Sequence, residues 1–165
     1  MRLSRPTAAF LALLVFAAGP LGGAAPPSAS WDAMKALVGE WSSTVEGRPV
    51  SVRYRLVANG TALMETLESG HADTMITMYA PDGATILATH YCSAGNQPRM
   101  RADASKAGKS LDFQFVDVSN AKASSSDVMQ RLVVTFVDAN HFHQQWTSRG
   151  ADGKEHTSLF QYTRR

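Results

Sequence analysis

The sequence predicts an all-β protein: a single antiparallel up-and-down β-barrel of about ten strands, with a short N-terminal helix. Two observations predict this class. From residue 40 onward, short segments of alternating apolar and polar residues follow one another, as in strands with one buried face. Turn signals separate these segments, such as Asn-Gly at 59–60 and Asp-Gly at 82–83, which tolerate the positive φ angles of tight hairpins.

The first 24 residues have the features of a signal peptide. Arg2 and Arg5 are followed by an apolar stretch over 8–18, and then by the small residues Gly22 and Ala24 before the expected cleavage point. We therefore expect residues 1–24 to be a signal peptide, 25–30 a linker and 31–165 one calycin-like β-barrel domain. The mature protein is expected to be exported, periplasmic or secreted. No membrane anchor is expected, because the cleavage region holds no cysteine to carry a lipid.

The charge of the mature chain excludes some partners. The whole chain has 16 Lys and Arg against 14 Asp and Glu, and the only charged residues of the expected signal peptide are its two arginines. The mature chain is therefore formally neutral, which gives no electrostatic basis for binding nucleic acid. Cys92 is the only cysteine, so no disulfide can form within the chain.

The elements follow in order. Residues 31–39 are expected to form a helical turn or two, with Ser30 or Asp32 as the N-cap and Gly39 as the stop. Ten strands are then expected, over 40–47, 50–57, 61–68, 73–79, 85–92, 98–104, 110–117, 129–137, 141–149 and 156–164. Closure into a barrel removes exposed strand edges, although a β-sandwich of the same strands is an alternative.

The start and end of the predicted domain resemble the calycin superfamily, which includes lipocalins, fatty-acid-binding proteins and nitrobindin-like barrels. "LVGEW" at 37–41 places Gly39 and Trp41 at the entry to the first strand, and "FQYTRR" places Arg164 in the last one. The resemblance implies that Trp41 closes one end of the barrel and that Arg164 packs on its ring. Ten strands are closer to the fatty-acid-binding and nitrobindin branches than to lipocalins.

"THYCSAGNQPRM" at 89–100 is the richest run of reactive side chains. It resembles a motif of exported bacterial proteins of unknown function, which implies no activity. In a strand over 85–92, His90 and Cys92 share one face, and a turn over 93–96 brings Arg99 onto the return strand. The candidate polar contacts to a ligand are His90, Cys92, Asn96, Gln97 and Arg99. A hairpin that uses the same groups for its own structure is the alternative.

Other candidate contacts come from different strands. Glu65 alternates with Leu63 and Leu67, so it is expected on an inner face, where Arg99 or Arg53 would compensate its burial. The opposite face, with Met64 and Glu68 inward, is the alternative. Apolar contacts to the ligand are expected from the aromatic residues Tyr91 and Trp146 and from methionines, for which an ordinary core is the alternative. The methionines are Met64, Met75, Met78, Met100 and Met129.

No catalytic template is present, so no catalytic residue is assigned. The sequence predicts a binding protein that holds a small, largely apolar or amphipathic molecule with a polar head inside the barrel. No cofactor is expected. The alternatives are a small enzyme or a haem- or metal-binding barrel using His90 and Cys92, with His71, His141, His143 or His156 as further ligands, and a filled barrel that docks a protein partner.

Overall fold

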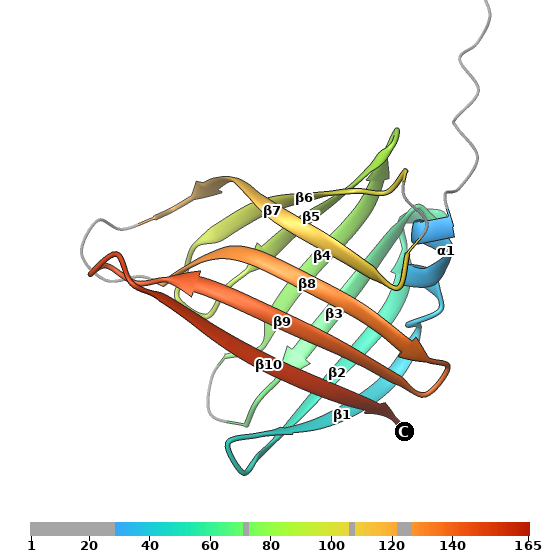
Figure 1. Cartoon of the computed structure of the whole chain (residues 1–165), viewed down its shortest axis with the longest axis horizontal. Coiled ribbons are helices and arrows are strands. Elements are labelled where there is room, and N and C mark those ends of the chain that lie inside the picture. Colours follow the sequence, from blue (N-terminus) through green and yellow to red (C-terminus); the bar gives the residue numbers. More distant parts are fainter. Residues whose placement is uncertain (1–28, 71–72, 106–107, 122–126) are drawn as a thin grey trace, which may run out of the picture.

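Ten antiparallel strands close into one barrel, in which each strand pairs with its sequence neighbours and the last pairs with the first (Figure 1). The computed structural model describes residues 29–70, 73–105, 108–121 and 127–165. The expected signal peptide and most of the linker lie outside these residues. The strands are β1 (Gly39–Val45), β2 (Arg48–Val57), β3 (Ala62–Glu68), β4 (Met75–Asp82), β5 (Thr85–Tyr91), β6 (Gln97–Asp103), β7 (Ser110–Ser119), β8 (Val128–Asp138), β9 (His141–Arg149) and β10 (Glu155–Arg164).

The predicted fold class is confirmed, and the sandwich alternative is wrong, because one continuous ladder runs around the sheet. The helix differs in detail from the prediction. α1 spans Ala29–Lys35, so Ser30 and Asp32 lie inside its first turn and do not cap it. Gly39 is the first residue of β1, and the chain between Lys35 and Gly39 is a turn. Among the described residues, no helix has the length and apolar character needed to span a membrane.

The half of the barrel next to α1 is filled by aromatic rings. Phe142 stacks on Tyr162 at 4.8 Å between ring centroids and meets the edge of Trp41 at 4.7 Å. Tyr79 and Phe113 form a second edge-to-face pair at 5.6 Å. All five side chains are buried, and such pairs add to the stability gained from burying the rings. This packing leaves the opposite half as the place where room inside the barrel can exist.

Beside α1, at the closed end of the barrel, the side chains of Arg164 and Trp41 make the contact that the calycin resemblance implies. The Arg164 guanidinium lies 4.0 Å from the centroid of the Trp41 ring. It donates hydrogen bonds to the carbonyl oxygens of Ala36, Val38 and Ala139 at 2.8–3.0 Å. Gly39 has φ +132°, and a Cβ there would lie 2.8 Å from Nη1 of Arg164. Gly39 is therefore required by both the backbone and the close approach of the arginine.

The ladder between β1 and β10 is the shortest of the barrel. These strands share only two register pairs, Trp41 with Arg164 and Ser42 with Thr163, whereas β9 and β10 share nine. The remainder of β10, residues 155–162, has no ladder partner on the β1 side among the described residues. We call this gap in the ladder the seam. It runs from near the closed end to the opposite end of the barrel, which we call the mouth.

Candidate functional site

A small cavity lies inside the barrel at the mouth, where β3, β5 and β9 end and β4, β8 and β10 begin. Its volume is about 90 Å³, and we call it the mouth cavity. Five apolar side chains, two histidines and two serines line it. They are Leu67, Met75, His90, Met129, Trp146, Ser148, His156, Ser158 and Phe160. Three of them, His156, Ser158 and Phe160, come from the part of β10 beside the seam, so the seam flanks the cavity.

His90 supplies the cavity's most buried polar group. It lies on the inner face of β5 and is only 4% exposed. Its Nδ1 is 2.9 Å from the hydroxyl of Thr77, its cross-strand partner on β4. Its Nε2, on the far side of the ring, is buried and has no hydrogen-bond partner among the described residues. Burial lowers the pKa of His90 to about 4, so the imidazole is neutral near pH 7 and has one donor and one acceptor nitrogen.

Trp146 also lines the cavity and packs from across the barrel on His90, with ring centroids 4.8 Å apart. Its indole N–H donates to Oε1 of Gln144 at 3.3 Å. The Nε2 of Gln144 in turn donates to Glu65 and to the Tyr54 hydroxyl, each at 2.8 Å. The wall of the cavity is thus held in place by a buried polar network deeper in the barrel.

Glu65 is the centre of that network. It is 1% exposed, and its Oε2 accepts hydrogen bonds from Tyr54 and Tyr79 at 2.7 Å in addition to that from Gln144. The Glu65 side chain points inward, as predicted, but the prediction that an arginine pairs with it is wrong. Arg53 and Arg99 lie on the outer face, where they pair with Glu40 and Asp117. Neutral donors surround the carboxylate instead.

The environment of Glu65 shifts several pKa values. Burial raises the pKa of Glu65, and the hydrogen bonds from the two tyrosines and Gln144 oppose this in part. Burial, followed by repulsion from the Glu65 charge, raises the pKa of Tyr54 and Tyr79 well above the ordinary value. Both tyrosines therefore stay protonated and remain donors to the carboxylate. The hydroxyl of Tyr162 is buried nearby in the core, without a hydrogen-bond partner in the described part of the chain.

The polar side chains of residues 89–100 do not gather around one site. Arg99 makes a two-pronged ion pair with Asp117 on the outside of the barrel, with Nη2 2.6 Å from Oδ2. Gln97 bonds the Gly95 carbonyl and Asn120. Asn96 is fully buried, and its amide donates to the Asp127 carbonyl at 3.1 Å, which ties this turn to the start of β8. These three residues therefore serve the hairpin and its neighbours.

The remaining predicted contacts divide between core and surface. Tyr91 points outward and is 48% exposed. Met100 is fully buried in the core but does not line the cavity. Cys92 is a half-buried free thiol beyond the end of β5, where its backbone bonds that of Asn96 and closes the turn. The Cys92 sulfur accepts a hydrogen bond from the Ala94 amide at 3.5 Å within this turn, and Cys92 does not line the mouth cavity. Of the predicted polar and aromatic ligand contacts, only His90 and Trp146 line the mouth cavity.

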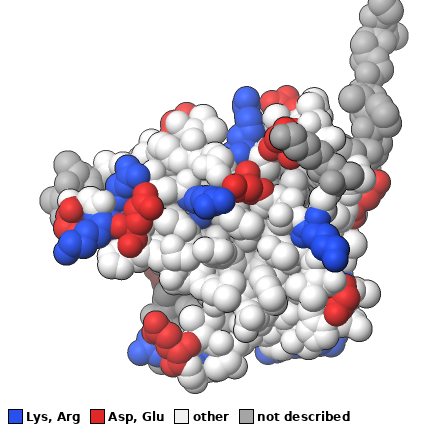
Figure 2. Space-filling view, in the orientation of Figure 1, with Lys and Arg blue, Asp and Glu red and all other residues white. Residues whose placement is uncertain are grey.

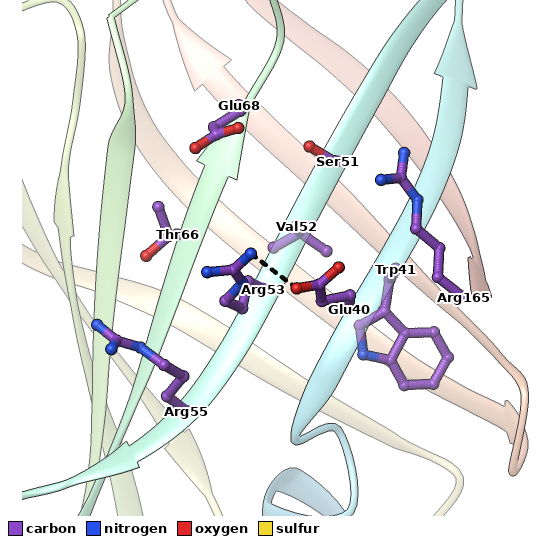
Figure 3. A pocket seen from close by; sticks show the side chains of 9 residues that line it. All are labelled: Glu40, Trp41, Ser51, Val52, Arg53, Arg55, Thr66, Glu68 and Arg165. Carbon is purple, nitrogen blue, oxygen red and sulfur yellow. Dashed lines mark ion pairs between the residues drawn. The ribbon is translucent and has the colours of Figure 1, made fainter.

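Two larger hollows lie on the outer wall. One, of about 300 Å³, is lined by side chains of β1, β2 and β3, with Arg53 paired to Glu40 at 2.7 Å and Arg55 and Glu68 nearby (Figure 3). The other, of about 460 Å³, lies over β7–β10 and contains Arg131, Arg149 and Glu155. The face in Figure 2 shows acidic and basic side chains mostly next to each other, with broad uncharged areas between. These hollows are exposed and lined by charged groups of both signs, so they offer no buried polar anchor.

Of the possible metal ligands, His90 and His156 line the mouth cavity, and the others that the structure describes do not line it. His141 is bonded to Asp138 at 2.9 Å, His143 lies on the outer face of β9, and His71 lies outside the described residues. Among the described residues, no group of three His, Cys, Asp or Glu side chains could hold a metal ion. Haem is larger than ligands of drug size, which already occupy cavities of about 300–1,000 Å³. At about 90 Å³, the mouth cavity is too small to fit haem.

Met75 and Met129, two of the methionines predicted to line a cavity, do line it. Ser148, Ser158 and Phe160 were not predicted, because they have the pattern of ordinary inner-face residues. Gln144 carries the clearest missed signal, because it interrupts the apolar inner face formed by Phe142 and Trp146 on β9. A polar side chain at such a position needs a buried partner.

Comparison with known proteins identifies a solved structure with a similar fold. No protein-family model and no curated protein sequence matches the chain. Among solved structures, the chain is similar to the crystal structure of Rv2717c from M. tuberculosis, with a TM-score of 0.60 and 10% sequence identity. The match covers 84% of this chain and 98% of that one. At this identity the likeness supports the barrel fold alone.

Proposed function

We propose that this protein binds a small, largely apolar molecule in the mouth cavity, with one polar group of the ligand bonded to His90. The observation that carries the proposal is a buried imidazole nitrogen with no partner among the described residues, on a histidine that lines a cavity whose other walls are mainly apolar. Ligand sites commonly combine apolar walls with a few fixed polar groups. A polar atom left unpaired in such a place costs free energy, which a ligand would recover.

The size of the cavity limits what can enter. Its volume of about 90 Å³ is of the same order as the roughly 150 Å³ of an apolar cavity that accepts a single benzene ring. The ligand is therefore one small ring or a short chain, or the terminal part of a larger molecule. A fatty acid lying inside the barrel would require the aromatic core of the closed half to move.

The proposal includes a calycin-like relationship and export. The Trp41–Arg164 contact and the ten-strand closed barrel support the first. The charge and apolar pattern of residues 1–24 supports the second. Docking of a protein partner is less well supported, because the exposed large apolar side chains of the described residues lie on different elements. They are Val38, Leu56, Tyr91, Val116, Val137 and Leu159.

Native mass spectrometry of the protein purified from its source cells tests the proposal. We expect a discrete excess mass above that of the polypeptide. Ser148 lines the cavity and is buried, so Ser148→Leu should fill the cavity and abolish the excess mass. Thr147→Leu, one residue away on the outer face of β9, is the matched control and should retain it. An excess mass that survives Ser148→Leu would place the ligand elsewhere and refute the site.

A further inference from the structure

The charges inside the barrel restrict the head group of the ligand. Among the residues that the structure describes, no lysine or arginine lines the mouth cavity. Arg99 is held on the outer wall by Asp117, and Arg164, at the closed end, bonds three carbonyl oxygens. The buried carboxyl group of Glu65 lies in the same interior, joined to the cavity wall through Gln144 and Trp146. A carboxylate or phosphate would lose its hydration here without meeting a cation, which is strongly unfavourable.

The hydrogen-bonding atoms of His90 further restrict which chemical groups can form the head of the ligand. The Thr77 hydroxyl beside Nδ1 can donate or accept, so Nε2 is an acceptor in one tautomer and a donor in the other. A carbonyl group of the ligand can only accept a hydrogen bond, so it pairs only with the tautomer in which Nε2 donates. An ammonium group can only donate, so it pairs only with the tautomer in which Nε2 accepts. A hydroxyl group serves both, because it can donate and accept.

The remaining lining favours a flat ligand body. Trp146, Phe160 and the His90 ring present aromatic surfaces, and Met75 and Met129 add two thioether side chains. Methionine sulfur makes favourable contacts with aromatic rings, and aromatic pairs gain energy beyond their buried area. The cavity of about 90 Å³ is smaller than the roughly 150 Å³ cavity that holds one benzene ring, so a single ring is the largest flat body that it could take.

We propose that the mouth cavity selects a small, neutral, single-ring aromatic molecule whose hydroxyl group hydrogen-bonds to Nε2 of His90. This inference rests on the proposed function and specifies the ligand class of the same site. It distinguishes the barrel from a carrier of fatty acids or other anions, since the selecting group is a neutral imidazole. Thr77 and Trp146 are positioning residues: Thr77 orients the ring through Nδ1, and Trp146 packs on its face.

Calorimetric titration with three single-ring probes tests the inference on the intact wild-type protein. Phenol has the ring and the hydroxyl, toluene has the same ring with a methyl group, and benzoate carries an anionic head. We expect phenol to bind about five- to tenfold more tightly than toluene, the ratio that one net hydrogen bond supplies. Benzoate should bind more weakly than both.

Two variants assign the preference to a residue. His90→Phe keeps a ring in the wall and removes the polar atom, so phenol and toluene should bind equally while toluene binding persists. His143→Phe makes the same change on the outer face of β9 and should leave the wild-type preference intact. The wild-type comparison of phenol and toluene does not depend on either variant folding.

Each unfavourable outcome of these titrations would overturn a different claim. Equal binding of phenol and toluene by the wild type would overturn the role of His90 while leaving an apolar binding cavity. Tightest binding by benzoate would overturn the neutral head group. Absence of binding by all three probes would overturn this inference, and an excess native mass that Ser148→Leu removes would then still uphold the broader binding function.

Discussion

Glu65 is the residue on which the interior network depends. Three donors meet one of its oxygens, so its removal leaves buried tyrosine and glutamine groups without their acceptor. We predict that Glu65→Ala lowers the free energy of unfolding by about 3 kcal/mol or more, because each buried unpaired group costs about 1–3 kcal/mol. Glu65→Gln retains an acceptor oxygen and should cost less. Urea unfolding measures both, with the exposed Glu68→Ala as control. A loss for Glu65→Ala no larger than that of the control would contradict the network.

The buried imidazole of His90 leads to a separate prediction, about how folding stability depends on pH. Its pKa is about 4 in the folded protein and about 6.5 in the unfolded chain. The unfolded chain therefore takes up the proton first as the pH falls, and folding stability is lost between about pH 6.5 and 4. The shift corresponds to about 3 kcal/mol.

The control for this effect is His90→Phe, which removes the titrating group and leaves Glu65 and all other groups in place. We expect the difference in unfolding free energy between wild type and variant to move in favour of the variant by about 3 kcal/mol from about pH 7.5 to 4, measured by urea unfolding at each pH. A difference that stays constant across this range would show that His90 is not buried in its neutral form.

At the scale of elements, Arg164 joins α1, β1 and the turn between β8 and β9. Its fork bonds carbonyl oxygens from three places and covers the Trp41 ring. Lysine cannot reproduce a planar fork. We predict that Arg164→Lys lowers the unfolding free energy by about 2 kcal/mol, measured by chemical denaturation. Arg165→Lys changes the neighbouring side chain, for which the structure shows only a backbone bond to Glu40, and should have almost no effect. Equal effects would refute a specific closing role.

The same scale shows why the fold was predictable and most of the site was not. The ten strands follow from local alternation and from glycine-containing turns. Gly39, Trp41 and Arg164, which meet at one end of the barrel, are the residues on which the calycin resemblance rests. The direction of His90 also follows from alternation. The contact between Trp146 and His90 joins strands on opposite sides of the barrel, and no local pattern encodes it.

Two of the misplaced residues have different causes. Arg99 alternates with the buried Pro98 and Met100 on β6, so its guanidinium lies on the outer wall, where it pairs with Asp117. Cys92 lies one residue beyond the end of its strand, where the period of two no longer applies. The position of Cys92 depends on where strand pairing stops, which composition and spacing leave open.

For the whole molecule, the seam is the weakest part of the closed ladder. Arg164 donates its N–H to Asn140 beside β9, so on β10 the amides of even-numbered residues face β9 and those of odd-numbered residues face the seam. We predict that the amides of Thr157, Leu159 and Gln161 exchange with solvent faster than those of Ser158 and Phe160, measured by NMR hydrogen exchange. Arg165, whose N–H donates to Glu40, is the protected control. Equal protection along β10 would mean that the seam is paired in solution.

The central claim is that the mouth cavity binds a small neutral ligand, and methionine methyl NMR during a phenol titration tests it most directly. The structure places one set of methyl groups beside the cavity, on Met75 and Met129, and others in the core, the closed end or the outer wall. The latter are Met100, Met34, Met64 and Met78. The account predicts saturable shifts confined to Met75 and Met129, lost in Ser148→Leu. Shifts at Met64 or Met78, or none at Met75 and Met129, would contradict it.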